Sequence, residues 1–478
     1  MSVTSQGTPG PGAALEIRPG EYGERVAAVE PGGVEFIPTA ERHGRPRQLL
    51  WTWASPNLEF ATIFVGVISV EFFGLSFWQA LLALFVGTVL GSVTHGVLSA
   101  RGPGHGVPQM VLGRVAFGHW GNLLPAGLMS LMAGIGWFAV NSVSGAFALA
   151  ALTHLPDLAS LALVVAAQIA VAFFGHNLVH VFERLMFPFL AVVFAVGAVV
   201  IFSKSHPGAP GTGGGTGGML ITAAAAFGYA AGWNPYAADY TRYLPADARR
   251  RLVGGYAGLG MFLSCFLLEA VGAASVTIGA PEGNPTAAFT GNLPSILAQL
   301  TLLAIAVGAV SANVLNIYSG AMAFLTMGLR VSLAFRRALV GLIFGVLGFL
   351  VAWSGLSDAG TKYENFLLVV AYWVGPWLGV VFADQWLRRG QRIDGMFFDR
   401  AYRNLAGPAS MLVGMAISIP LFSNQQLYVG VVARHVPAVG DITFLVGFVL
   451  SLLSYLLLTR RVRQPAAQRL EPSPDRTV

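Results

Sequence analysis

Long apolar segments separated by short polar ones recur along nearly the whole chain. Twelve of these segments have about the 17 to 25 residues that an α-helix needs to cross the hydrocarbon of a bilayer, and they follow a polar stretch of 48 residues. We therefore expect an all-α polytopic membrane protein with twelve transmembrane helices. The expected helices cover residues 50–74, 77–99, 122–152, 158–176, 178–202, 218–243, 252–278, 296–327, 337–355, 364–387, 406–423 and 439–459.

Two of the expected helices are interrupted by a proline with polar neighbours. The first contains Ser-Pro-Asn at 55–57, and the sixth contains Gly-Trp-Asn-Pro at 232–235. A proline removes an intrahelical hydrogen bond, and hydrocarbon offers no replacement partner, so such a break must be buried in protein or line a cavity. The breaks are five helices apart, and an odd number of helices inverts the second unit relative to the first. Paired broken helices in inverted halves indicate a binding site near the midplane of a secondary transporter.

This pattern divides the chain into segments. We expect a first five-helix repeat at 49–203, a second, inverted one at 218–390, and two accessory helices within 391–460. The glycine-rich segment 204–217 is expected to be a connector. The N-terminal segment 1–48 is polar and rich in glycine and proline, so we expect a partly disordered tail there, and a second tail at 461–478.

Charge predicts the orientation of the helices. Charged residues make up only 10% of the chain, against about 25% in soluble domains. If the N-terminus is cytoplasmic, all but three of the 28 lysine and arginine residues lie on the cytoplasmic side, the exceptions being Lys204, Lys362 and Arg434. We expect a cytoplasmic-membrane protein with both termini in the cytoplasm. The net charge of +6 follows from this topology, so nucleic-acid binding is not expected.

Few residues suit catalysis or metal binding. A single cysteine, Cys265, permits neither an intrachain disulfide nor a cysteine-based metal site. The histidines fall mostly in expected loops, and the carboxylates in the expected helices are scattered. A membrane enzyme would need convergent catalytic groups, and a channel would need a continuous polar lining. We therefore expect a transporter without a cofactor.

Two motifs resemble the purine–cytosine permease branch of the nucleobase–cation symporter family. They are GWNPYAADYTRY at 232–243, and GHGVPQM at 104–110 followed by GRVAFG at 113–118. The resemblance implies the leucine-transporter-like fold, in which two inverted five-helix repeats are followed by two further helices. It also implies import of cytosine, a purine or a related small heterocycle together with a cation, by alternating access. An amino-acid or other small-solute symporter of the same fold is the alternative.

A nucleobase is flat and carries donors and acceptors along its edge. A site for it needs an aromatic ring, whose stacking is worth about 1–3 kcal/mol, and carboxamides, which offer both a donor and an acceptor. Trp137 and Asn141 are four residues apart in the third expected helix and so share one face. The resemblance implies that this pair stacks on the base and contacts its edge. It implies a second aromatic ring at Trp233, or at Phe227 or Tyr229 if the break aligns differently.

The eighth expected helix adds Asn313 and Asn316. The resemblance implies that Asn316, which precedes Ile-Tyr-Ser, contacts the base, whereas Asn313 is expected to hold neighbouring helices together. Leu315 stands where fungal relatives have a proline, which leaves the local backbone and the preference among bases open. Within the two breaks, Ser55 and Gly232 are expected to contribute to substrate binding.

The coupling cation depends on Glu59 and Ser311. Carboxylates in transmembrane helices are rare and functional by default, and Glu59 lies near the midplane, whereas Glu71 and Glu269 lie further toward the outside. Sodium in this fold is implied to lie between the first and eighth helices, where sodium-coupled relatives carry two adjacent hydroxyls. Here the corresponding pair is Val310 and Ser311, so one hydroxyl is missing. We favour a proton carried by Glu59, with sodium at Ser311 as the alternative.

Overall fold

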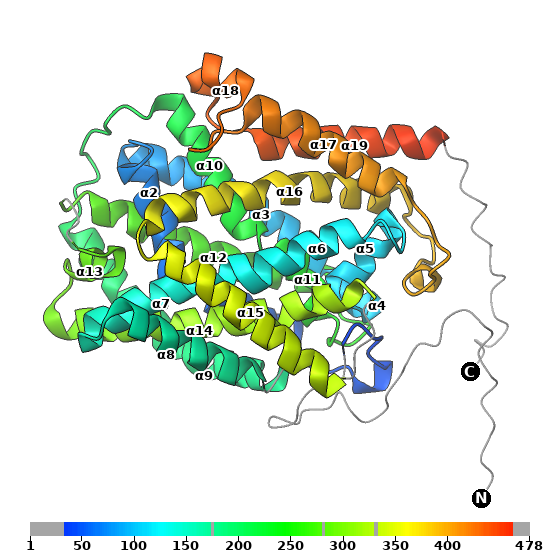
Figure 1. The fold of residues 1–478 in the computed structure, drawn as a ribbon, viewed down its shortest axis with the longest axis horizontal. Helices are drawn as coiled ribbons and strands as arrows, with labels where there is room; N and C mark the ends of the chain where they lie inside the picture. Colours follow the sequence, from blue (N-terminus) through cyan, green and yellow to red (C-terminus); the bar gives the residue numbers. More distant parts are fainter. Residues whose placement is uncertain (1–32, 174–175, 280–282, 329–332, 462–478) are drawn as a thin grey trace, which may run out of the picture.

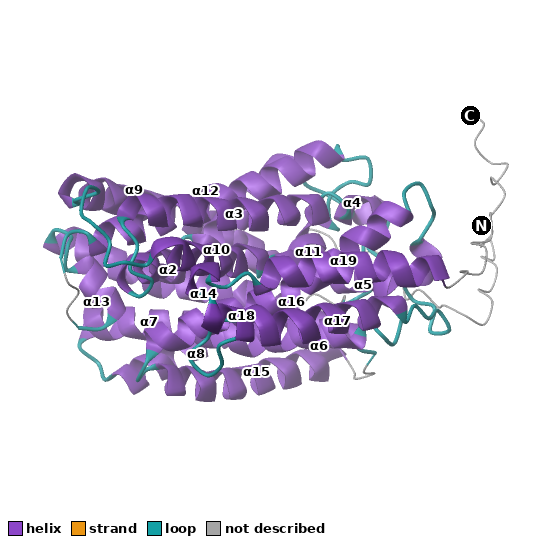
Figure 2. Ribbon diagram, turned by 90° about the horizontal axis from the view of Figure 1, so that it is seen from above, coloured by secondary structure: helices purple, strands orange, loops and turns teal. Residues whose placement is uncertain are grey.

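The structure is a computed structural model that describes residues 33–173, 176–279, 283–328 and 333–461. In these residues the regular secondary structure is helical, and the helices run along one long axis (Figures 1 and 2). Six helices in the described ranges are long and apolar enough to cross a membrane, and a bent pair, Pro46–Asn57 with Phe60–Glu71, makes a seventh candidate. The prediction of an all-helical, multi-pass membrane protein is confirmed. The count of twelve spans stays a prediction.

Helices of the first half begin and end close to the expected positions. After the short turns η1 (Thr39–Glu41) and η2 (Pro46–Gln48) come α1 (Leu49–Ala54), η3 (Ser55–Asn57), α2 (Phe60–Glu71), α3 (Phe77–Ser99), α4 (Gly102–His105), α5 (Gln109–Phe117), α6 (Leu123–Leu131), η4 (Met132–Trp137), α7 (Phe138–Thr153), α8 (Asp157–Phe173) and α9 (His176–Lys204). The elements α6, η4 and α7 form one continuous helix, in which η4 is a wider, π-type segment.

The second half repeats the alternation of a broken helix and long helices. Its elements are α10 (Gly215–Ala231), η5 (Asn234–Tyr236), α11 (Ala237–Thr241), α12 (Arg250–Val276), α13 (Pro285–Thr290), α14 (Ser295–Thr326), α15 (Leu333–Gly355), α16 (Ala359–Leu387), η6 (Asp394–Met396), α17 (Ala406–Phe422), α18 (Val431–His435), η7 (Pro437–Val439) and α19 (Thr443–Arg461). The largest shift from the predicted bounds is at α16, which begins five residues before the expected position 364.

Both predicted helix breaks are present. After η3 the backbone leaves helical geometry at Leu58 and Glu59, and α2 continues at 62° to the preceding helix. The second break separates α10 from α11 through Gly232, Trp233 and η5. The prolines of the two breaks stand in the first turn of η3 and η5, where the missing N–H has no helical partner to lose.

Glycines bring the backbones of four helices into direct contact. A Cβ on Gly66 of α2 would lie 1.8 Å from the carbonyl oxygen of Glu269 in α12. A Cβ on Gly87 of α3 would lie 2.3 Å from the carbonyl oxygen of Ala223 in α10, and one on Gly96 would lie 2.6 Å from that of Gly254 in α12. Small residues permit such close helix packing in membranes. The first broken helix therefore packs on α12, and the second packs on α3.

The segment 33–48 packs across the end of the bundle at which α4 and α5 lie (Figure 1). The amide of Ile37 donates to the carbonyl of Gly106 at 3.0 Å, and the amide of His43 donates to the carbonyl of Tyr243 at 2.7 Å. Part of the expected N-terminal tail thus has a fixed position, while residues 1–32 and 462–478 lie outside the described residues. We call this end of the bundle the α4 end, and the opposite one, which carries α13, the α13 end.

Candidate functional site

Three buried asparagines meet where α7 crosses α14. The amide nitrogens of Asn141 and Asn316 both lie within hydrogen-bond distance of Asn313 Oδ1, at 3.0 and 3.1 Å. Asn313 itself donates to the carbonyl oxygen of Phe138 at 2.9 Å, and Tyr236 in the second break donates to Asn316 Oδ1 at 2.8 Å. The structure therefore brings the predicted edge-reading amides, Asn141 and Asn316, into one cluster. Asn313 connects α14 to the backbone of α7, as expected of a residue that holds helices together.

Trp137 ends the π-type segment directly before this cluster. Its ring is buried, with edge contacts to Tyr229 of α10 at 5.3 Å and to Phe366 of α16 at 4.9 Å between ring centroids. Gly232 lies under the same ring, because a Cβ there would be 3.0 Å from Trp137 Cζ2. Trp137 and Gly232 are therefore brought together.

Trp233 has a different environment. Its indole nitrogen donates to Asn57 Oδ1 at 2.9 Å, and its ring packs near Trp53 and Tyr236, with centroid distances of 5.9 and 5.0 Å. The aromatic residue of α10 that contacts Trp137 is Tyr229, one of the two alternatives at this position. The other alternative, Phe227, stacks on Phe444 of α19 at 4.3 Å.

Glu59 lies at the first break and is only 2% exposed. Tyr229 donates its hydroxyl to Glu59 Oε1 at 3.1 Å, and the hydroxyls of Tyr229 and Thr62 are 2.5 Å apart. The amide of Asn141 lies 3.2 to 3.3 Å from the two carboxylate oxygens of Glu59. Glu59 therefore connects the first break to both the aromatic and the amide parts of the site.

The other predicted residues lie around this centre. Ser55 and Ser311 are fully buried, and α14 approaches the first break closely, because a Cβ on Gly308 would lie 2.8 Å from the carbonyl of Leu58. Glu269 of α12 is buried and accepts a hydrogen bond from Thr88 at 2.6 Å. Within the described ranges, no group of three or more histidine, cysteine, aspartate or glutamate side chains is placed to hold a metal.

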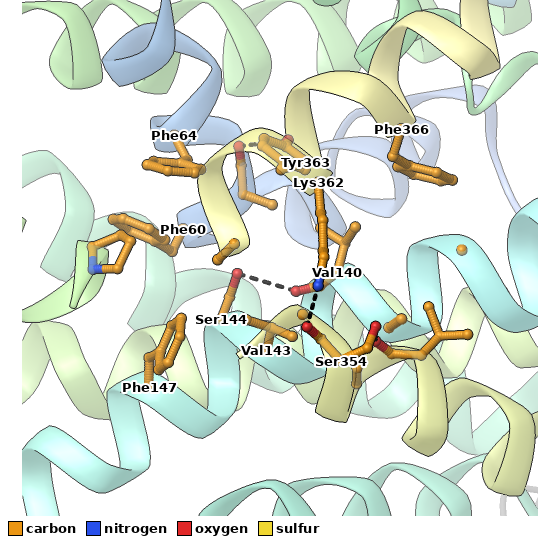
Figure 3. A pocket seen from close by; sticks show the side chains of 18 residues that line it. Phe60, Phe64, Val140, Val143, Ser144, Phe147, Ser354, Lys362, Tyr363 and Phe366 are labelled. Carbon is orange, nitrogen blue, oxygen red and sulfur yellow. Dashed lines mark hydrogen bonds between the residues drawn. The ribbon is translucent and has the colours of Figure 1, made fainter. Parts of the chain in front are cut away.

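A cavity of about 210 Å³ lies between α2, α7, α15 and α16, toward the α13 end (Figure 3). Its walls are mainly apolar and include Phe60, Phe64 and Phe366. The exposed Lys362 also lines it and donates to the carbonyl oxygen of Ser354, so the cavity reaches the surface. Since Phe366 both lines the cavity and contacts the ring of Trp137, it lies between the cavity and the buried site.

The α4 side of the site is closed by polar contacts. The guanidinium of Arg242 donates to the hydroxyls of Tyr243 and Tyr318 at 2.8 and 3.2 Å, and to the carbonyl of Gly33 at 3.0 Å. This end also carries His119, whose pKa is lowered to about 4 by burial and by nearby arginine side chains.

The sequence did not predict Tyr236 or Phe366 as parts of the site. Tyr236 belongs to the same motif as Gly232. Its position in the second break could therefore have indicated that it lies in the site. Phe366 lies in an apolar run that resembles any membrane helix. Together the groups provide a face of aromatic rings and an edge of carboxamides, an arrangement that suits a flat, uncharged heterocycle.

Known proteins are similar to this chain over most of its length. The profile of a family described as permease for cytosine/purines, uracil, thiamine, allantoin matches residues 36–447. A putative purine-cytosine permease, YxlA of Bacillus subtilis, is 27% identical over 464 residues, covering 92% of this chain and 98% of the relative. The purine-cytosine permease fcyB of Emericella nidulans is 28% identical over 466 residues, covering 91% of this chain and 90% of the relative.

Solved structures of the transporter Mhp1 have a similar fold. The inward-facing conformation superposes with a TM-score of 0.68 at 19% identity, covering 91% of this chain and 94% of that one. A closed conformation with bromovinylhydantoin bound, described as a nucleobase-cation-symport-1 family transporter, gives 0.66 at 19% identity, covering 93% of this chain and 95% of that one. At this identity the likeness shows the fold.

Proposed function

The chain belongs to the family of permeases for cytosine/purines, uracil, thiamine and allantoin, and from this premise we propose that it is a cation-coupled symporter. It imports a nucleobase, cytosine or a purine, or a related small heterocycle, by alternating access. Membership of a permease family confirms the prediction of a transporter over an enzyme. The observation that carries the proposal is the cluster of buried amides beside Trp137, where α7 crosses α14 next to the two helix breaks.

In this proposal Trp137 stacks on the base, and Asn141 and Asn316 bond its edge. The amides now bond to one another and to Tyr236, so a base would exchange these bonds for its own rather than leave buried groups unpaired. A substrate without donors and acceptors on its edge could not make this exchange, which gives the site its selectivity.

We infer two inverted five-helix repeats, 49–203 and 218–390, joined by the connector 204–217 and followed by two accessory helices in 391–460. Reciprocal packing supports this. The broken helix of each half packs on a long helix of the other half, α2 on α12 and α10 on α3. Likewise α8 packs on α14, and α15 packs on α7. Twelve membrane-spanning helices follow if the shorter apolar helices, among them α17 and α19, and the broken helix α10–α11 also cross.

The α4 end faces the cytoplasm in this proposal, in the cytoplasmic membrane, with both termini on that side. Arginine distribution supports the orientation. Arg42, Arg101, Arg242, Arg388 and Arg403 belong to the α4 end, whereas Lys204, Lys362 and Arg434 belong to segments of the other end. The cavity beside Phe366 then opens outward, and the contacts of Arg242 close the path to the cytoplasm.

We favour a proton as the coupling cation, with Glu59 as its carrier. Burial at the first break and the contact with Asn141 support Glu59, since a proton bound there would act directly on the substrate site. Sodium bound at Ser311 is the second candidate, and the proximity of α14 to the first break supports it.

Uptake in a permease-deficient host tests the proposal. Radiolabelled cytosine, adenine, uracil, hydantoin and amino acids are compared, with and without sodium and with a protonophore. We expect accumulation of one or more heterocycles that stops when the ion gradient is dissipated. Uptake competed by amino acids and untouched by free bases would instead establish the alternative, an amino-acid symporter of the same fold.

A further inference from the structure

The amide of Asn141 lies between a carboxylate and two other amides. One end of it is 3.2 to 3.3 Å from both oxygens of Glu59, and the other end is 3.0 Å from Asn313 Oδ1 and 3.2 Å from Asn316 Nδ2. A carboxamide donates only through its nitrogen and accepts through its oxygen. The direction in which this amide points is therefore set by which of its neighbours can donate.

One direction places Nδ2 of Asn141 on Asn313 Oδ1, where it donates. Oδ1 of Asn141 then faces the two oxygens of Glu59. Oxygen atoms this close are stable together only if one carries a hydrogen, so this direction requires a protonated Glu59 that donates to Asn141.

The reversed direction places Nδ2 of Asn141 on Glu59, where it donates to the carboxylate at 3.2 to 3.3 Å. Oδ1 of Asn141 then accepts from Asn316 Nδ2 at 3.2 Å, but it also lies 3.0 Å from Asn313 Oδ1, a contact between two acceptors. Bonds to a charged carboxylate have to offset this contact, so the reversed direction requires an ionised Glu59. This direction fits an ionised Glu59, because a carboxylate only accepts and its bonds to N–H donors are strong.

We propose that Glu59 is a positioning residue whose protonation turns the amide of Asn141 and so changes the hydrogen-bonding edge that Asn141 and Asn316 offer to the base. When Glu59 is ionised, it holds the N–H groups of Asn141. When Glu59 is protonated, these N–H groups point toward Asn313 and Asn316, where an acceptor of the base can take them. The inference rests on the proposed function and specifies how proton and base are coupled.

A thermodynamic consequence follows. If protonation of Glu59 strengthens base binding by some factor, base binding strengthens proton binding by the same factor. The proton and the base then bind cooperatively without touching each other, because the amide of Asn141 lies between the carboxylate of Glu59 and the amides that bond the base.

Other titratable groups surround Glu59, and their contributions to the pH dependence have to be distinguished from that of Glu59. Tyr229 of α10 bonds to it directly. Tyr363 of α16 and Cys265 of α12 interact with its charge. Glu269 of α12 is the other carboxylic acid near these two residues, and it is bonded to Thr88. Glu269→Gln is therefore the matched control for Glu59→Gln.

The test is equilibrium binding of radiolabelled cytosine, or of radiolabelled adenine if cytosine is not taken up, to the purified full-length protein in nanodiscs, from pH 5 to pH 8. We expect the affinity of the parent protein to rise about tenfold as the pH falls, which is an ordinary size for coupling between two sites. Glu59→Gln should bind with a pH-independent affinity near that of the parent at low pH, because its carboxamide donates to Asn141 at every pH. Glu269→Gln should keep the pH dependence of the parent.

Asn141→Leu separates the amide mechanism from simple charge effects. It keeps Glu59 but removes the amide, so binding should be weaker and independent of pH. An unchanged pH dependence in Asn141→Leu, or a pH-independent affinity in the parent, would overturn the inference and leave the proposed function standing.

A measurement without base completes the test. Infrared spectra across a pH step should contain the C=O stretch of a protonated carboxyl that disappears in Glu59→Gln and shifts in Asn141→Leu. If these spectral changes are observed but the protein binds no base, the proposed function is contradicted, whereas the link between Glu59 and Asn141 is supported. A Glu59 band that does not shift in Asn141→Leu would contradict the link itself.

Discussion

The indole nitrogen of Trp233 donates a hydrogen bond to Asn57 Oδ1 at 2.9 Å, and this bond joins the two helix breaks directly. Asn57 also donates to the carbonyl oxygen of Trp53 one turn earlier, at 2.6 Å. The side chain of Asn57 therefore replaces part of the bonding that η3 removes from the first helix, and it ties that helix to the second break. A change in the backbone conformation of one break would therefore alter the hydrogen bond that it shares with the other.

Trp233→Phe should reduce stability because it leaves the buried Asn57 Oδ1 without this donor, at a cost of about 1–3 kcal/mol. Trp53→Phe is the matched control, since the indole nitrogen of Trp53 has no hydrogen-bond partner within the described part of the chain. Thermal unfolding in detergent compares the two variants. Equal losses of stability would mean that ring volume, rather than the bond to Asn57, is what matters.

Trp137→Ala should lose most transport, whereas Trp137→Phe should keep part of it, because a smaller ring still offers a face for stacking. Radiolabelled uptake is measured after the amount of each variant in the membrane has been determined. Parental uptake by a correctly inserted alanine variant would refute the stacking role.

Asn141→Ala and Asn316→Ala should each weaken the apparent affinity for the base by about tenfold or more, since an unpaired buried partner costs about 1–3 kcal/mol. Asn313→Ala should lower stability more than affinity, because Asn313 bonds to the backbone of α7. Competition curves give the affinities, and thermal unfolding gives the stabilities. Small, equal losses of stability with unchanged affinity in all three variants would assign all three asparagines to helix packing.

Gly232→Ala should impair transport, because its new methyl group would lie 3.0 Å from Trp137 Cζ2 and would displace the ring. Gly255→Ala in α12 is the control, since a Cβ there meets no atom within 4 Å. Uptake and membrane abundance are measured for both. If the two variants transport equally well, the ring of Trp137 is not held by Gly232.

Uptake should rise as the external pH falls, because a protonated Glu59 is the form that suits base binding. A protonophore should abolish accumulation, sodium should not be required, and Glu59→Gln should bind base but no longer concentrate it. His119 should not contribute to this profile, since its pKa of about 4 keeps it neutral between pH 5 and pH 8. A strict sodium requirement, with a pH-independent Glu59→Gln variant that still accumulates base, would assign the coupling to sodium at Ser311.

Local chemistry made both breaks predictable. A proline removes a helical hydrogen bond by its own covalent structure, and polar neighbours can replace that bond, so η3 and η5 could be predicted without tertiary information. The spacing of Trp137 and Asn141 likewise placed them on one face. The choice of Tyr229 over Trp233 as the neighbour of Trp137 could not be predicted, because the turn of the backbone at Gly232 and Trp233 decides which side of the broken helix faces α7.

Contacts between segments that are distant in the chain could also not be predicted from the sequence. Phe366 lies in an apolar run, and only the packing of α16 against α7 brings it to Trp137. The bonds among Asn141, Asn313 and Asn316 depend on the register between α7 and α14, which the periodicity of either helix alone does not define.

The glycine contacts among α2, α12, α3 and α10 have a mechanical consequence. Where backbones touch without side chains between them, as at Gly66, Gly96 and Gly87, one helix cannot slide along the next without a steric clash. We therefore expect these four helices to move together rather than to slide past one another. The contacts of Glu59 with Asn141 and of Tyr236 with Asn316 join the two broken helices to α7 and α14. If the four helices rotate relative to α7 and α14 during transport, these polar bonds are the ones that would break and re-form.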